Sequence, residues 1–226
     1  MARHPLSLLL ALLASVFTIA YGFRVPPTPN IVQRDENLPA RVPYVFPPPG
    51  TDPIADAIRA RRVNGTLLAL DGALLNSPLV AQGWNQFFTV IRENLTIPAD
   101  MRELFILRTA ALNNAAYQWG QHESVGRSEG LTTDQLLVIR LASQSALTHH
   151  DKKVLGDSLA AALQFADAIT ESVYVPRDVY DNLAKHLSDQ QMVEAVATAG
   201  SYNFVSRFTV SLNVDGRMHE EVPIPQ

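Results

Sequence analysis

Cysteine is absent from all 226 residues of the sequence. The chain can therefore form no disulfide bond and perform no thiol chemistry, so its packed core alone must hold the fold. Clusters of Lys and Arg are also absent, and the formal net charge is −4. This charge pattern offers no basic face to the phosphates of a nucleic acid, so we expect no nucleic-acid partner.

Proline is nearly absent from the body of the chain. Within residues 54–222 it occurs only as Pro78, Pro98 and Pro176, each beside the start of a helical pattern. A missing backbone N–H costs little at that position. Apolar residues in "NSPLVAQGWNQFFTVIREN" recur at helical spacing. We therefore predict an all-α domain over residues 51–226.

Helix starts and stops are marked by polar residues and glycine. Thr132 and Ser188 each have a glutamine three residues later, the spacing of a capping box, and Gly130 is typical of a helix C-terminus. The run His149-His150-Asp151 is interpreted as a further helix start with Asp151 as its cap. We predict no metal site in this chain.

The N-terminal stretch "MARHPLSLLLALLASVFTIAYGF" has a short basic start, an apolar run ending at Ala20 and a small residue at Gly22. This pattern predicts a signal peptide over residues 1–22 and a secreted or secretory-pathway protein. Cleavage after Ala20 is nearly as plausible as cleavage after Gly22, and an uncleaved anchor is the alternative, although the run is short for a span. Two N-glycosylation sequons, at Asn64 and Asn94, agree with this route.

A Pro-rich arm is predicted over residues 23–50. Eight of the fifteen prolines fall between Pro26 and Pro49, and such a segment sustains neither a helix nor a central strand. The arm is either a disordered spacer or a strap that packs Val45 and Phe46 onto the domain or onto a neighbouring subunit.

The stretch "MRELFILRTAALNNAAYQWGQHE" carries the candidate chemistry. At about 100° per residue, Glu103, Gln118 and His122 share one helix face. On one straight helix, however, Glu103 and His122 would lie roughly 28 Å apart. A turn at Asn113-Asn114 would bring the two halves level, because Asn readily adopts turn conformations. A neighbouring subunit is the other source of the acid.

The spacing Glu-x₁₁-Ala-x₂-Gln-x₃-His, with the sequence around it from about Asp71 to Leu141, resembles the carboxymuconolactone decarboxylase/AhpD-like family. The redox-active branch of that family carries a Cys-x-x-Cys pair where this chain has Ala115 and Gln118. The family's acid and distal histidine fall on Glu103 and His122. The resemblance implies an AhpD-like fold that assembles as trimers or hexamers. It also implies the decarboxylase branch, because a thiol peroxidase needs the missing cysteines.

Acid–base chemistry is what remains without thiols. We predict a cofactor-free decarboxylase, or a related lyase or isomerase, that acts on a small oxygenated acid or lactone in catabolism or secondary-metabolite biosynthesis. In this hypothesis His122 is the general acid and base, Glu103 orients it, and Gln118 binds the developing oxyanion. Tyr117 and Trp119, which flank this face, are expected to bind the substrate.

An anionic substrate would need a fixed cation. The candidates are Arg102, Arg108, Arg127 and Arg207, of which Arg207 is the first choice because it follows "SYNFVS" on a mostly apolar helix. A structural salt bridge is the alternative for Arg207. The alternative for the whole site is a core histidine at His122 in a non-catalytic secreted protein that binds a small molecule.

Overall fold

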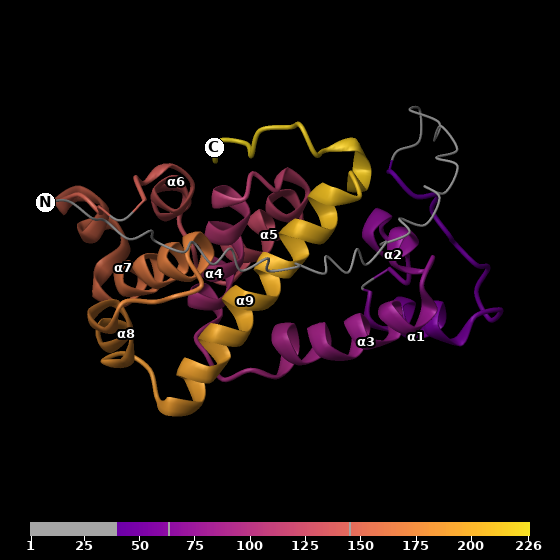
Figure 1. The fold of residues 1–226 in the computed structure, drawn as a ribbon, viewed down its shortest axis with the longest axis horizontal. Helices are drawn as coiled ribbons and strands as arrows, with labels where there is room; N and C mark the ends of the chain where they lie inside the picture. Colours follow the sequence, from indigo (N-terminus) through magenta and orange to yellow (C-terminus); the bar gives the residue numbers. More distant parts are fainter. Residues whose placement is uncertain (1–39, 63, 145) are drawn as a thin grey trace, which may run out of the picture. The chain divides into compact units, whose positions relative to one another are not determined.

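Helices are the only regular secondary structure in the residues that the computed structural model describes, which are 40–62, 64–144 and 146–226 (Figure 1). The predicted all-α class is confirmed for this part of the chain. The predicted signal peptide over residues 1–22, and the arm up to residue 39, lie outside the described residues. No helix in the described part is long and apolar enough to cross a membrane. In chain order the elements are α1 (Pro53–Arg61), α2 (Ala69–Leu74), α3 (Pro78–Thr89), the π-helix η1 (Val90–Asn94), α4 (Ala99–Leu112), α5 (Ala116–Ser128), α6 (Thr133–Leu141), α7 (His149–Glu171), α8 (Arg177–Ala184), α9 (Asp189–Ser211) and the 3₁₀-helix η2 (Val214–Gly216).

Side chains cap several of these helices as the sequence indicates. Asp52 accepts hydrogen bonds from two backbone N–H groups at the start of α1. Thr132 and Gln135 form the predicted capping box of α6. The start of α7 differs from the prediction, because Thr148 is the N-cap and Asp151 is its capping-box partner. The predicted cap, Asp151, is thus the second member of the capping box.

Helix α4 lies at the centre of the domain, in contact with α5, α6, α7 and α9 (Figure 1). Leu104, Phe105 and Leu107 on this helix are fully buried. Arg108 is also buried, with its Nε 2.5 Å from Oδ1 of Asp167, and its other nitrogens donate to backbone carbonyls. Arg108, a candidate for binding an anion, is therefore committed to the core.

A tight turn folds α5 back along α4. Asn114 has a left-handed backbone, with φ of 48°, and the N–H groups of Asn114 and Ala115 donate to the carbonyls of Ala111 and Ala110. These two bonds form a Schellman motif, in which asparagine takes the place usually held by glycine. The predicted turn at Asn113-Asn114 is confirmed, and α4 and α5 form a helical hairpin.

The N-terminal helices pack beside this hairpin through α3 and α9. Ser77 precedes α3, and Pro78 occupies its first turn, where proline is well tolerated. Trp84 on α3 packs against Phe204 on α9, with ring centroids 5.1 Å apart. Directly after α3, η1 adds a wider π-helical turn, a rare element that occurs frequently at functional sites.

The described end of the Pro-rich arm, residues 40–50, lies along α2. The backbone N–H of Val45 donates to the carbonyl of Gly72 at 3.0 Å, and the ring of Phe46 covers the same glycine. A Cβ on Gly72 would lie 2.6 Å from that ring, so no larger residue fits there without displacing it. Of the two interpretations of the arm, a strap packed onto the domain is therefore confirmed for residues 40–50.

Candidate active site

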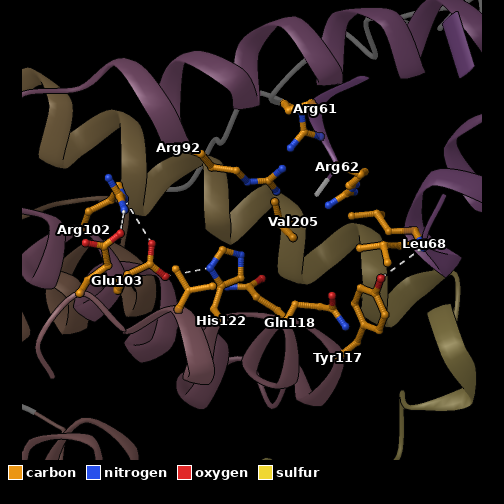
Figure 2. Close-up of a pocket in the computed structure, with 14 residues that line it drawn as sticks. Arg61, Arg62, Leu68, Arg92, Arg102, Glu103, Tyr117, Gln118, His122 and Val205 are labelled. Carbon is orange, nitrogen blue, oxygen red and sulfur yellow. Dashed lines mark hydrogen bonds and ion pairs between the residues drawn. The ribbon is translucent and has the colours of Figure 1, made fainter. Parts of the chain in front are cut away.

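A cavity of about 270 Å³ lies between the α4–α5 hairpin, α9 and the N-terminal elements (Figure 2). Helix α5 supplies one wall, and the ends of α1, α2 and η1 supply the other. The cavity is lined by Arg61, Arg62, Leu68, Leu70, Arg92, Arg102, Glu103, Tyr117, Gln118, Gln121, His122, Val125, Glu129 and Val205.

Glu103 and His122 meet in this cavity. The Nδ1 of His122 lies 2.9 Å from Oε2 of Glu103, and their side chains are 12% and 2% exposed. A carboxylate can only accept a hydrogen bond, so Nδ1 must carry the proton and Nε2 of the neutral ring is left as an acceptor. The ring of Tyr202 packs edge-on against the imidazole, at 5.0 Å between centroids. The chain thus joins the predicted acid and base within one subunit.

The carboxyl of Glu103 is held ionised by its neighbours. Burial by itself raises the pKa of Glu103, but the hydrogen bond and positive charge of His122, together with the charge of Arg102, outweigh burial and lower it. Arg102 donates from Nε to Oε1 of Glu103 at 3.2 Å. It also reaches Glu129 at 3.4 Å. Arg102 therefore binds Oε1 of Glu103, and His122 binds Oε2.

The side chain of Gln118 is held by two hydrogen bonds within the fold. Its amide Nε2 donates to the carbonyl of Ile106 at 2.9 Å, and its Oε1 accepts from the hydroxyl of Ser206 at 3.0 Å. The side chain lines the cavity but is 1% exposed. One N–H of the amide remains for a ligand oxygen.

The two aromatic residues predicted to bind substrate have different positions. Tyr117 lines the cavity, and its hydroxyl accepts a hydrogen bond from the N–H of Leu70 at 3.3 Å. Burial raises the pKa of Tyr117 to about 12, so the hydroxyl keeps its proton and can donate it in a hydrogen bond. Trp119 does not line the cavity: it is fully buried in the core and donates to Glu123 at 2.8 Å. The structure therefore gives Trp119 no contact with a ligand in this cavity.

Arg207, the first choice for a fixed cation, lies away from the cavity. It is exposed on α9, and its Nη1 donates to the backbone and side chain of Asn203. Arg127 forms an ion pair with Glu123 at 2.8 Å. Of the four predicted candidates, only Arg102 lines the cavity. Arg207 was predicted to face the site because α9 is mostly apolar. The apolar character of a helix does not show which of its faces is turned toward the cavity.

Three arginines that line the cavity were not among the predicted candidates: Arg61, Arg62 and Arg92. The first two end α1 as adjacent basic residues, and the third stands in the π-helical turn. A pair of arginines at a helix end is common as a complement to the helix dipole. The adjacent arginines at positions 61 and 62 were therefore visible in the sequence, but the pattern does not distinguish a ligand-binding role from a role at the helix end.

Both predicted sequon asparagines are exposed, Asn64 in the turn after α1 and Asn94 at the end of η1. Exposure is compatible with glycosylation, and the use of these sites stays a prediction.

Comparison with solved structures finds similar folds, among them two proteins. One is a protein of unknown function from Agrobacterium tumefaciens, proposed to be the antioxidant defence protein AhpD. It is 19% identical with a TM-score of 0.54, and the match covers 66% of this chain and 94% of that one. The other is a debrominase, in a cysteine-to-alanine variant bound to 2,3,4-tribromopyrrole. It is 16% identical with a TM-score of 0.61, and the match covers 76% of this chain and 89% of that one.

No curated protein matches the sequence. Residues 78–168, from α3 into α7, match the carboxymuconolactone decarboxylase family. This region includes Glu103 and His122 and most of the α5 wall of the cavity. The two structural neighbours share the helical fold around it. The chain thus contains a region that matches the carboxymuconolactone decarboxylase family, lacks cysteine and has an AhpD-like fold.

Proposed function

We propose that this protein is an acid–base enzyme, a decarboxylase or a related lyase or isomerase, that acts on a small oxygenated acid or lactone without a cofactor. The observation that carries the proposal is the buried hydrogen bond of 2.9 Å between Glu103 and His122 in a cavity lined by arginines. A carboxylate that fixes the tautomer of a histidine leaves the other ring nitrogen ready to take or give a proton.

The chemical step uses His122 as the proton carrier. In a decarboxylation, the bond between carbon and the leaving carboxylate breaks, and its electron pair moves into an adjacent carbonyl to give an enolate. Protonated His122 then delivers the Nε2 proton to that carbon and recovers a proton from solvent. In an isomerisation, neutral His122 first removes a proton from carbon and returns it elsewhere. The carboxylate of Glu103 is bonded to His122 and Arg102, so we assign it the role of a positioning residue.

The enolate oxygen needs hydrogen-bond donors in the transition state. Gln118 keeps one N–H for this purpose, and Tyr117 keeps its hydroxyl proton because its pKa is raised to about 12. Leu70, Val125 and Val205 add an apolar surface to the same cavity. Because the volume of about 270 Å³ falls below that of pockets for drug-sized ligands, a compact substrate is favoured.

Release of CO₂ from a panel of β-keto acids and carboxylated lactones tests this function. We expect turnover of at least one compound by the wild type and a large loss in His122→Ala. The matched control is His186→Ala, which removes an exposed histidine outside the cavity. Ligands that raise the melting temperature without giving any product would favour the alternative, a non-catalytic binding protein.

We also propose that the chain forms a homo-oligomer through one apolar surface, which we call the α3/α9 face. On α3, Phe87 stands beside Gly83, and on α9, Phe204 stands beside Gly200. A Cβ on either glycine would meet nothing within 4 Å. Exposed apolar side chains gathered on one surface are typical of a contact between subunits. The exposed apolar residues of α3, η1 and α9 that would form this face are Val80, Phe87, Val90, Val193, Val196 and Phe204.

A further inference from the structure

Two of the cavity arginines have only neutral partners. Arg61 donates from Nε to the side-chain oxygen of Asn85 at 3.0 Å. Arg92 donates from Nε to the hydroxyl of Tyr202 at 2.9 Å, and its guanidinium lies 5.0 Å from the ring centroid of Phe88. Within the described residues, no carboxylate forms an ion pair with either arginine. In a partly buried site, a cation without a counter-charge is unfavourable unless a ligand supplies one.

The positive charges of Arg61, Arg62 and Arg92 repel one another. Burial lowers the pKa of Arg61, and the charges of Arg92 and Arg62 lower it further, while Asp71 and Glu93 act in the opposite direction with smaller effect. Arg62 is already paired with Asp71 at 2.7 Å. The Nε of Arg62 is buried without a hydrogen-bond partner. The wall therefore combines three guanidinium groups with one ion-paired carboxylate.

These arginines face the α5 wall from the other side of the cavity. Figure 2 shows Arg61, Arg62 and Arg92 gathered above His122 and Gln118. Arg61 and Arg62 precede residue 78, where the family match begins, so the N-terminal part of the chain completes a cavity whose acid–base pair belongs to the family region. A group bound at this wall would face His122 and Gln118 (Figure 2).

We propose that Arg61 and Arg92 form a subsite for a carboxylate of the substrate, one that is retained during the reaction while His122 acts on a carbon at the other end. A guanidinium presents its N–H donors in a plane that matches the two oxygens of a carboxylate. The substrate is thus an organic acid held by an anionic group away from the reacting carbon. This proposal rests on the acid–base function proposed above for the identity of the reaction, but anion binding itself requires no turnover.

Calorimetric titration of the whole protein with glutarate tests the subsite, with glutaramide as the uncharged analogue and inorganic phosphate as a tetrahedral anion. We expect glutarate to bind more tightly than either. Arg61→Met and Arg92→Met should each weaken glutarate binding by about 10- to 100-fold, the range for losing a hydrogen bond to a charged group. Arg207→Met removes the same charge outside the cavity and should bind glutarate like the wild type.

The folded state of each variant is checked by circular dichroism, and Arg61→Lys and Arg92→Lys supply charge-retaining versions that should keep part of the affinity. Equal binding of glutarate by Arg61→Met, Arg92→Met and Arg207→Met, or no binding by the wild type, would overturn the subsite. Tighter binding of phosphate than of glutarate would overturn the assignment to a carboxylate.

The subsite and the proposed function fail separately. If glutarate binding depends on the two arginines but no acid in the panel is turned over, the subsite stands and the proposed enzymatic function is wrong. If turnover depends on His122 but the KM is unchanged in Arg61→Met and Arg92→Met, the proposed enzymatic function stands and the subsite is wrong.

Discussion

Glu103→Gln isolates the role of the carboxylate, because each oxygen of Glu103 accepts from a different donor. Oε1 accepts from Nε of Arg102 at 3.2 Å, and Oε2 faces Nδ1 of His122 at 2.9 Å. Glutamine has only one oxygen, and arginine has no acceptor for the new NH₂ group. The amide therefore places its oxygen at Arg102 and its NH₂ at His122. Nδ1 must then lose its proton, and the neutral ring carries the proton on Nε2.

The size of this effect follows from the two hydrogen bonds that compete for the amide oxygen. A hydrogen bond to a charged donor contributes about 1.5–3 kcal/mol, and one between neutral groups about 0.5–1.5 kcal/mol. The difference of roughly 1–2 kcal/mol favours the bond to Arg102 by about 5- to 30-fold. We therefore expect Glu103→Gln to reduce proton removal by neutral His122 by at least that factor, because the base nitrogen is occupied.

Nitrogen-15 NMR of labelled histidine reads the tautomer directly, at a pH where the ring is neutral. We expect the proton on Nδ1 in the wild type and on Nε2 in Glu103→Gln. The matched control is Arg102→Met combined with Glu103→Gln, which frees the amide oxygen to accept from Nδ1 and should restore the wild-type tautomer. A proton that stays on Nδ1 in Glu103→Gln would refute the reasoning, as would a double variant identical to the single one.

Three further predictions concern stability and assembly. Arg108→Met leaves the carboxylate of Asp167 buried without its main partner, so urea unfolding should show a free energy of unfolding that is lower by about 3–5 kcal/mol. Adding Asp167→Leu should recover most of this loss. A loss under about 1 kcal/mol in Arg108→Met would contradict the prediction. The pKa of Glu103 is lower in the folded chain than its usual 4.5, so its contribution to stability is present above pH 4.5 and is lost as the pH falls through the folded pKa. Glu103→Gln should flatten this acid limb in thermal melts, and an unchanged limb would argue against it. Phe204→Glu on the α3/α9 face should give a monomer by light scattering if the wild type is an oligomer, whereas Arg207→Glu should not; a monomeric wild type would remove the proposed interface.

Local chemistry explains what could be predicted from the sequence. The turn at Asn114 was predictable because few residues other than glycine and asparagine adopt its left-handed backbone. That turn, with the helical period, offered one route to a contact between Glu103 and His122, and a neighbouring subunit was the other. The capping box at Thr132 is a signal of the same short range.

Long-range packing decides the rest. Trp119 and Tyr117 flank the same helix face, and only the packing of α5 against its neighbours puts one in the core and the other in the cavity. Arg92 reaches the cavity from a π-helical turn, whose register the ordinary helical period does not give. Arg61 arrives from α1, which packs on α3. Such contacts between distant segments leave no periodic trace in the sequence.

Proton transfer at carbon is the central claim, and deuterium incorporation measures it most directly. The protein is incubated in D₂O with the panel of β-keto acids and lactones, and NMR follows deuterium at the carbon next to the carbonyl. We predict incorporation by the wild type and by His186→Ala, and a rate on the order of 10²–10⁴ lower in folded His122→Ala. Incorporation at the same rate in His122→Ala, or none in the wild type, would contradict the account.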